Sequence, residues 1–242
     1  MAEAELKVAI ITGASSGVGA ETAVLLAEAG YSVALLARRA ERLDQVLARI
    51  AEEVPDAPGG AMAVPTDVTD PEAIRQAGEA VLARFGRVDA LVNCAGNAPL
   101  MPIEKITPGV YRECMDANVG AVVLLTAAVW PTFKKQKRGV VVNVSSMSSI
   151  DPFPGFSLYA AAKIGVNMFT KCTADEGARF GVRAVAVAPG AVETPMLRQN
   201  FSEKVLPREK TLDPVEVAEV IRDCVTGARA FEAGEVIVVE SP

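Results

Sequence analysis

The chain has 242 residues, of which 50% are hydrophobic, and it carries a formal net charge of −6 with four cysteines and no histidine. This length and composition predict a single domain over residues 1–242 with a large core, and the acidic balance argues against a nucleic-acid partner. Without histidine neither a Ser-His-Asp triad nor the usual imidazole zinc site can be built, so no metal site is expected.

The chain also gives no sign of export or membrane insertion. Residues 1–7 contain two glutamates and lack the basic and apolar regions of a signal peptide. The longest apolar stretch, residues 119–130, is too short to span a bilayer. The cysteines lack CxxC spacing and are expected to be reduced core residues. We therefore expect a cytoplasmic protein with no membrane partner.

The first element is an apolar run at residues 6–12, and it ends in Gly13-Ala14-Ser15-Ser16-Gly17-Val18-Gly19 before a stretch of helical composition that stops at Gly30. This order predicts a strand, a glycine turn and a helix. Such a turn lets a pyrophosphate approach the backbone, and the helix N-terminus favours its negative charge. A tight turn without a ligand remains possible. The same letters match the G-x-S-x-G pattern of hydrolases, but that interpretation has little support without histidine.

The second strand, residues 31–37, is followed by Arg38 and Arg39. An NAD site usually places an acidic residue here to bind the ribose hydroxyls. A guanidinium can instead pair with the 2′-phosphate of NADP. The alternative is that both arginines only cap or decorate the helix that begins at Ala40. We expect NADP(H) rather than NAD(H) as the coenzyme.

Strands and helices alternate to the end of the chain. This alternation predicts an α/β fold, a Rossmann-type doubly wound parallel sheet of about seven strands with helices on both faces. Ligands bind such sheets at the carboxyl ends of the strands. Further strands are predicted at residues 61–66, 88–94, 139–146, 182–188 and 235–239, and helices at residues 40–54, 71–85, 108–135, 156–169 and 214–226.

Tyr159 and Lys163 lie four residues apart in the helix predicted at residues 156–169, so they share one helix face. A neighbouring ammonium favours the phenolate and moves the tyrosine pKa toward neutrality. Tyr159 could then pass a proton to or from an oxygen atom. The alternative is a packed ring beside a solvated amine.

Taken together, the motifs resemble the classical short-chain dehydrogenase/reductases. The likeness runs from about Lys7 to the end of the chain. The family's serine lies thirteen residues before its tyrosine, which selects Ser146, although the neighbouring serines at 145, 148 and 149 remain possible. The motifs that carry the resemblance are Thr12-Gly13-x-x-x-Gly17-x-Gly19, Asn93-x-Ala95-Gly96, Asn118, Ser146, Tyr159-x-x-x-Lys163 and Pro189-Gly190.

The resemblance implies a role for each catalytic residue. Ser146 would bind the substrate oxygen, and Tyr159 would exchange the proton. Lys163 would lower the tyrosine pKa and hold the nicotinamide ribose, while Asn118 would hold a water of the proton relay. With Tyr159 and Lys163, the coenzyme-binding residues expected from the motifs are Gly13, Ser15, Ser16, Gly17, Val18, Gly19, Arg38, Arg39, Asp67, Val68, Asn93, Ala95, Gly96, Pro189, Gly190, Val192 and Thr194.

Some positions depart from the family pattern. Cys94 replaces a common asparagine and Ala162 a common serine or threonine, but neither position supplies the proton-transfer group. The C-terminus lacks the glycine pair that ends many members, which weakens assignment as a 3-oxoacyl-carrier-protein reductase. The substrate pocket is expected to be mostly apolar. Its predicted lining is Asn97, Pro99, Leu100, Met101, Ile150, Phe153, Phe156, Met196, Leu197 and Phe201.

The sequence thus predicts an NADP(H)-dependent oxidoreductase acting on an apolar ketone, aldehyde or secondary alcohol. A substrate loop is expected at about residues 191–212, and its part at residues 201–212 is expected to form a lid that orders over the coenzyme. The helices that begin near Pro108 and Phe156 are rich in small and apolar residues, so a homodimer or homotetramer is expected. The alternative is a non-catalytic NADP(H)-binding regulator or scaffold. An epimerase or dehydratase would need an additional substrate domain, for which the chain has little room.

Overall fold

The computed structural model describes residues 6–55 and 59–242, and its centre is one parallel sheet of seven strands. The strand order is β3-β2-β1-β4-β5-β6-β7. The direction in which strands are added reverses at β1. Strands β2 and β3 lie on one side of β1, and strands β4 to β7 lie on the other. Residues 1–5 carry most of the N-terminal segment for which no signal peptide was expected, and they lie outside the described residues. The strands are β1 (Lys7–Thr12), β2 (Tyr31–Ala37), β3 (Ala61–Pro65), β4 (Ala90–Asn93), β5 (Gly139–Val144), β6 (Val182–Pro189) and β7 (Val236–Val239).

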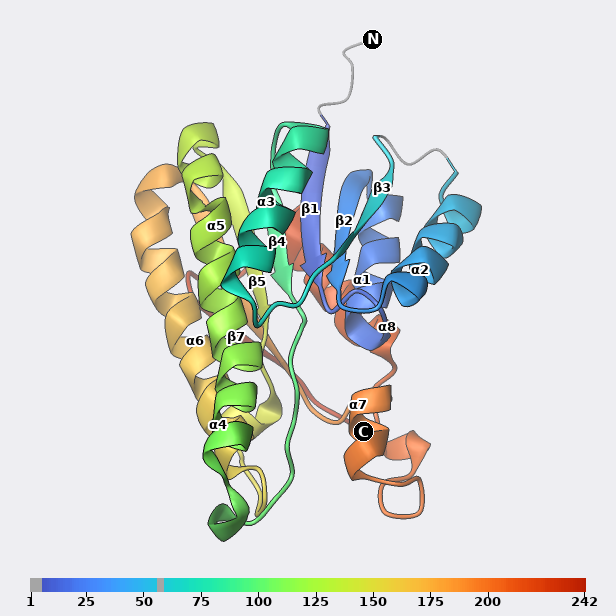
Figure 1. Cartoon of the computed structure of the whole chain (residues 1–242), viewed down its shortest axis with the longest axis vertical. Coiled ribbons are helices and arrows are strands. Elements are labelled where there is room, and N and C mark those ends of the chain that lie inside the picture. Colours follow the sequence, from blue (N-terminus) through green and yellow to red (C-terminus); the bar gives the residue numbers. More distant parts are fainter. Residues whose placement is uncertain (1–5, 56–58) are drawn as a thin grey trace.

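Helices cover both faces of the sheet, which confirms the doubly wound α/β prediction (Figure 1). Helices α1, α2 and α8 pack on one face, and α3, α5 and α6 pack on the other. The helices are α1 (Gly17–Glu28), α2 (Ala40–Glu53), α3 (Pro71–Phe85), α4 (Pro108–Met115), α5 (Ala121–Gln136), α6 (Ser157–Gly177), α7 (Pro195–Asn200) and α8 (Pro214–Thr226).

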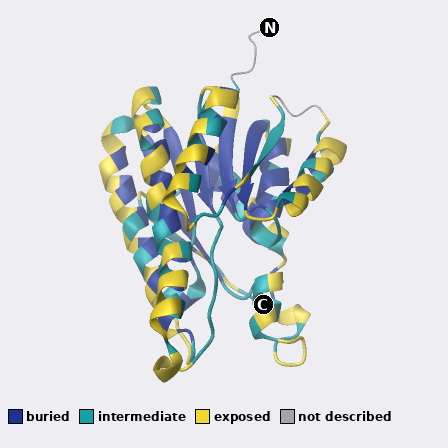
Figure 2. Cartoon of the chain, in the orientation of Figure 1, coloured by how far each residue is buried: buried dark blue, intermediate teal, exposed yellow. Residues whose placement is uncertain are grey.

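Each central strand contributes side chains to two hydrophobic cores, because successive side chains point to opposite faces of the sheet. In β1, Ala9 and Ile11 pack toward α1 and α8, whereas Val8 and Ile10 pack toward α3 and α5. Figure 2 shows the result, central strands that are buried between helices whose outer faces are exposed, while the edge strands β3 and β7 are only partly buried. The short valine-rich runs of the sequence are therefore the signature of strands buried on both sides.

Sequence signals locate several helix ends. Asp70 accepts a hydrogen bond from the backbone of Glu72 and precedes Pro71, and Asp213 forms a capping box with Glu216. Both arrangements satisfy amide groups that a helix start leaves unpaired. Helices α3 and α8 accordingly begin and end where the sequence predicts.

The predicted helix at residues 108–135 is interrupted. A π-helical segment, Asp116–Gly120, separates α4 from α5. The stretch Pro108–Gln136 is long and apolar enough to meet a membrane-span criterion, but α5 buries Leu125, Val129 and Phe133 against the sheet. We therefore describe α5 as a core helix.

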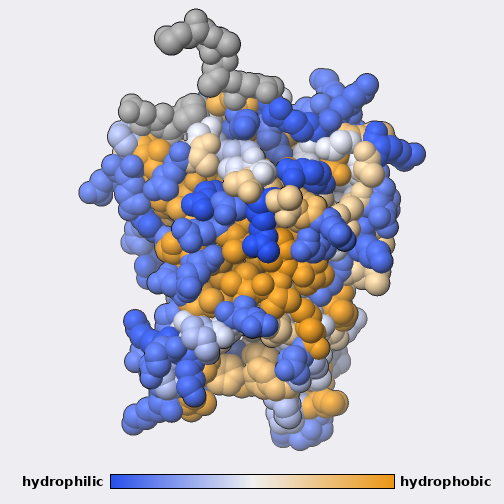
Figure 3. Space-filling model, turned by 180° about the vertical axis from the view of Figure 1, so that it is seen from behind, coloured by the Kyte–Doolittle hydropathy of each residue, from blue (hydrophilic) through white to orange (hydrophobic). Residues whose placement is uncertain are grey.

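Two local expectations fail. Cys172 is exposed on α6 and is not a core residue, because helix periodicity turns it outward. The short helix α7, in the segment between β6 and α8, was not predicted, although Thr194 caps it and Pro195 begins it. From the side opposite to Figure 1, apolar side chains concentrate across the middle of the surface and polar ones toward its margins (Figure 3).

Candidate active site

A cleft of about 1080 Å³ opens at the carboxyl ends of the strands. It brings together segments that follow all seven strands, as expected for a ligand site of a doubly wound sheet. Twenty of the predicted catalytic and coenzyme-binding residues line it: Gly13, Ser15, Ser16, Gly17, Val18, Gly19, Arg38, Arg39, Asp67, Val68, Ala95, Gly96, Asn118, Ser146, Tyr159, Lys163, Pro189, Gly190, Val192 and Thr194.

Asn93 is the exception among the predicted residues. Its side chain is 2% exposed and lies behind the cleft, where its Nδ2 donates to Oδ1 of Asn143 at 2.8 Å. Asn143 in turn donates to the Thr170 hydroxyl at 2.8 Å. These bonds join two strands to α6 because a buried amide needs partners inside the protein. Asn93 supports the wall of the cleft and does not form its surface.

The glycine turn after β1 brings main-chain segments into close contact. A Cβ on Gly19 would lie 2.5 Å from the Gly13 carbonyl oxygen, and one on Gly13 would lie 2.9 Å from the Ala95 nitrogen. Gly13 and Gly17 also have φ angles of 66° and 55°, which favour glycine. The Ser16 side chain makes no capping bond to α1. The surface of the cleft at this turn therefore consists of main-chain atoms and the N-terminus of α1, an arrangement that favours binding of a pyrophosphate.

Thr12 has a structural role that was not predicted, although the glycine motif of residues 12–19 begins with it. Its hydroxyl oxygen accepts hydrogen bonds from the backbone nitrogens of Cys94 and Ala95, each at 3.1 Å. The hydroxyl therefore ties the end of β4 to the end of β1 and fixes one wall of the cleft. A polar residue that ends a buried strand is the signal that could have identified it.

Both arginines after β2 are exposed and line the cleft. Nη2 of Arg39 donates to the Ser15 hydroxyl at 3.1 Å, so this side chain reaches across to the glycine turn. Thr69 hydrogen bonds, aided by the charge of Arg38, hold the pKa of Asp67 below its usual value. The cleft thus has a positively charged corner beside the turn.

The predicted catalytic residues meet at the end of β5 and the start of α6. Lys163 is 5% exposed, its Nζ donates to the Val144 carbonyl at 2.8 Å, and it lies 5.7 Å from the centre of the Tyr159 ring. The main-chain carbonyl fixes the lysine amine at the floor of the cleft. Tyr159, Lys163 and Ser146 therefore share one site, as the spacing predicted.

The pKa of Tyr159 differs from the expectation. Burial raises it to about 12, although the Ser146 hydroxyl acts in the opposite direction. Burial also lowers the pKa of Lys163 to about 8. Desolvation disfavours the charged form of each group, so in this structure Tyr159 is a neutral phenol and Lys163 does not produce the predicted lowering.

Ser146 has a fixed hydrogen-bonding role. Its Oγ accepts from the backbone nitrogen of Ser148 at 3.1 Å and from the Ser148 hydroxyl at 3.0 Å. A serine oxygen has two acceptor positions and one proton to donate. With both acceptor positions used, the Ser146 proton is available to a group in the cleft. Ser148, which the sequence left as a possible alternative, supports Ser146.

Asn118 lies in the π-helical segment, and its Nδ2 donates to the Cys114 carbonyl at 2.9 Å and to the Asn97 carbonyl at 2.9 Å. In a regular α-helix the Cys114 carbonyl would accept a hydrogen bond from the backbone amide of Asn118, four residues later. The amide side chain thus stabilises the irregular turn, a feature common at functional sites. The buried Oδ1 of Asn118 has no hydrogen-bond partner among the described residues and suits a bound water.

Aromatic side chains line the end of the cleft away from the glycine turn. Phe156 packs against Tyr159 with ring centres 5.3 Å apart, and it lies 4.6 Å from Phe153 and 6.1 Å from Phe201. Ile150, expected in the lining, is 53% exposed and does not line the cleft, although Asp151 and Phe153 after it do. Of the predicted lining, Asn97, Phe153, Phe156, Met196, Leu197 and Phe201 line the cleft, while Pro99 and Met101 line a smaller adjoining hollow and Leu100 packs near Gly155.

The chain is similar to known proteins over nearly its whole length. A family model described as "short chain dehydrogenase" matches residues 7–205. The 3-oxoacyl-[acyl-carrier-protein] reductase FabG of Thermotoga maritima is 35% identical over 243 aligned positions, which cover 98% of this chain and 97% of the relative.

Solved structures show the same fold. The 3-ketoacyl-(acyl-carrier-protein) reductase from Brucella melitensis complexed with NADH has a TM-score of 0.88 at 32% identity, with 96% of each chain covered. An alcohol dehydrogenase from the archaeon Thermococcus sibiricus complexed with 5-hydroxy-NADP has a TM-score of 0.87 at 28% identity, covering 98% of this chain and 97% of its own. Both nicotinamide coenzyme types thus occur among similar structures.

Proposed function

Because the chain belongs to the short-chain dehydrogenase family and is an oxidoreductase of the nicotinamide-dependent kind, we propose that it exchanges a hydride between NADP(H) and an apolar ketone or secondary alcohol. The observation that carries this proposal is the meeting of Ser146, Tyr159 and Lys163 in one cleft with the glycine turn. A bound nicotinamide supplies or accepts the hydride. The protein must then bind the substrate oxygen and move its proton.

In the reductive direction Tyr159 acts as the acid. Burial keeps it protonated at neutral pH, so its hydroxyl can donate to the oxygen that gains negative charge. Ser146 donates its free proton to the same oxygen, since Ser148 occupies its acceptor positions. Lys163 and a water held by the unpartnered Oδ1 of Asn118 return a proton to Tyr159. In the oxidative direction the same groups act in reverse.

The first test compares the wild-type protein with Tyr159→Phe in NADPH oxidation, using aldehydes and apolar ketones with NADH as the coenzyme control. We expect kcat to fall about 10²- to 10⁴-fold while the affinity for NADPH stays within a few fold. Turnover that survives the substitution would contradict the role of Tyr159. Tight coenzyme binding with no turnover by the wild type would favour the regulator or scaffold alternative.

We further propose that Arg38 and Arg39 select NADP(H) through the 2′-phosphate. The positively charged corner beside Ser15 supports this choice. Arg38→Asp should weaken NADPH at least about tenfold and leave NADH nearly unchanged. Arg42→Asp is the matched control, since Arg42 is exposed on α2 and outside the cleft. Equal losses for both coenzymes would exclude this role for Arg38.

A homodimer or homotetramer remains our prediction for the assembly. Ile164 and Met168, one turn apart on α6, are 53% and 62% exposed, and Tyr111 on α4 is 51% exposed. Apolar groups gathered on one side of a molecule mark contact surfaces. Light scattering at micromolar concentration is the test, and a monomeric mass would contradict it. A cytoplasmic location also remains a prediction, and the four free cysteines support a reducing compartment.

A further inference from the structure

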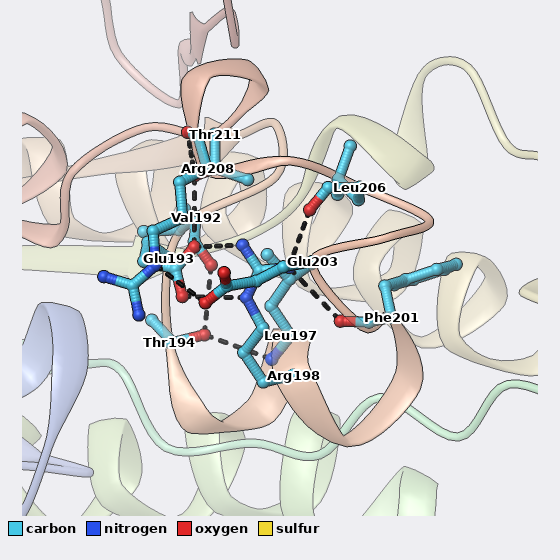
Figure 4. A network of polar contacts seen from close by, with 10 residues as sticks. All are labelled: Val192, Glu193, Thr194, Leu197, Arg198, Phe201, Glu203, Leu206, Arg208 and Thr211. Atoms are coloured by element: carbon cyan, nitrogen blue, oxygen red, sulfur yellow. Dashed lines mark hydrogen bonds and ion pairs between the residues drawn. The ribbon is translucent and has the colours of Figure 1, made fainter.

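The segment between β6 and α8 is organised around one side chain, Arg198 (Figure 4). Its guanidinium forms a bidentate ion pair with Glu193, in which Nε donates to Oε1 at 2.8 Å and Nη2 donates to Oε2. Nη1 donates to the main-chain carbonyls of Leu206 at 2.7 Å and Phe201 at 3.3 Å. Only the planar fork of arginine reaches a carboxylate and two carbonyls at once.

The partner carboxylate lies where the segment leaves and rejoins the body of the protein. Val192 and Leu212 form a parallel bridge, and the nitrogen of Glu193 donates to the Leu212 carbonyl at 2.9 Å. The Thr211 hydroxyl also donates to Oε2 of Glu193 at 3.3 Å. Arg198 therefore ties the middle of the loop to both of its ends.

The same loop contacts both ends of the cleft. Near its start, Thr194 caps α7 and lies against the glycine turn, because a Cβ on Gly17 would come within 2.9 Å of its methyl group. Near its middle, Phe201 joins the aromatic cluster, 6.1 Å from both Phe153 and Phe156. The main-chain carbonyl of Phe201 is one of the groups that Arg198 holds.

We propose that Arg198 is a positioning residue that fixes Phe201 as a wall of the substrate pocket, and that this pocket prefers aromatic carbonyl compounds to small aliphatic ones. Three phenylalanine rings that line the cleft cluster beside Tyr159, with Phe156 in direct contact with it, and such rings favour a flat ring by offset or edge contacts. A carbonyl group attached to such a ring then faces Tyr159 and Ser146. This inference rests on the proposed function and names its substrate class.

The contacts of Arg198 do not depend on a coenzyme, since each of them lies within residues 193–206. The loop is thus held in shape before ligands bind, which keeps the cost of ordering it low. The expectation that residues 201–212 form a lid over the coenzyme stays a prediction.

The experiment measures binding, so it does not depend on turnover. Calorimetry with the NADPH complex compares benzamide, an unreactive aromatic carbonyl compound, with acetamide. The wild type should bind benzamide at least about tenfold more tightly. Arg198→Met should reduce this preference to about threefold or less and leave the Kd of NADPH within a factor of about two. Arg198→Lys keeps the charge but loses the fork, so it should restore the preference only in part.

Arg208→Met is the matched control because Arg208 lies on the same loop but pairs with Glu203 at 2.8 Å on the surface. It should keep the wild-type preference. Equal binding of both amides by the wild type would overturn the substrate class, and an unchanged preference in Arg198→Met and Arg198→Lys would overturn the role of Arg198. Both results are independent of the proposed function, whose own failure appears as a lack of Tyr159-dependent turnover.

Discussion

The two ends of the cleft are built from different parts of the chain. At the coenzyme end the surface is mostly main chain, and Gly13 and Gly19 let neighbouring segments touch. At the substrate end the surface is made of side chains, with Phe156 on α6, Phe153 before it and Phe201 in the loop after β6. A backbone surface tolerates almost no added atom, whereas packed side chains can readjust. We therefore expect substitutions at the coenzyme end to have the larger effects.

The largest effect should come from Gly19→Ala. The added Cβ would meet the Gly13 carbonyl oxygen at 2.5 Å, and this backbone atom cannot move alone. We expect the free energy of unfolding to fall by about 1–3 kcal/mol and the affinity for NADPH to fall at least about tenfold. Denaturant unfolding and calorimetry measure the two quantities.

Gly78→Ala is the matched control for this change. Gly78 lies inside α3, and a Cβ added there would meet only the Ala128 side chain, at 4.0 Å. Alanine should stabilise this helix by about 0.5–1 kcal/mol and leave NADPH binding unchanged. If Gly19→Ala behaved like Gly78→Ala, the contrast between the two ends of the cleft would fail.

An intermediate effect is expected at Lys163, where the two ends meet. Its pKa is lowered to about 8 in the folded protein from 10.5. Between these pH values this group holds more protons in the unfolded chain than in the folded protein, so its contribution to stability rises with pH, while the raised pKa of the buried thiols at positions 94, 114 and 224 acts in the opposite sense. From pH 7.5 to 9.5 the contribution is about 2 kcal/mol, which denaturant unfolding of the coenzyme-free protein can measure.

Two variants separate this effect from other titrations. Relative to the wild type, Lys163→Met should lose this contribution, whereas Lys171→Met, at an exposed position of the same helix, should keep the wild-type pH dependence. Tyr159 acts in the opposite sense above pH 10, because its raised pKa of about 12 keeps a proton that the unfolded chain has lost. Parallel pH curves for the wild type and Lys163→Met would show that Lys163 is not desolvated as described.

The smallest effect is expected for Ser148→Ala. The substitution removes the hydroxyl that donates to Ser146 at 3.0 Å but keeps the backbone donor. Loss of one such hydrogen bond, worth about 1 kcal/mol, should lower kcat about fivefold without changing NADPH affinity. Ser148→Thr retains a hydroxyl and should recover much of the rate. A loss of NADPH affinity in Ser148→Ala would place this residue at the coenzyme end instead.

Local signals account for most of the successful predictions. The glycine turn, the Tyr159–Lys163 spacing and the alternating strands and helices each depend on residues close together in the sequence. They identified every strand of the sheet and the residues that meet in the cleft. The predictions that Asn93 and Ile150 line the cleft were less accurate, because they required knowing whether each side chain faces the cleft. That choice depends on neighbours from distant segments.

The residues alone predict the parallel α/β fold, the position of the cleft and the presence of Tyr159 and Lys163 within it, because period and turn chemistry act locally. The tertiary structure decided what surrounds those groups. It placed Ser148 behind Ser146, interrupted the helix at Asn118 and joined Arg198 to the loop carbonyls. It also reversed the expected pKa shift of Tyr159, since desolvation depends on all the atoms packed around the ring.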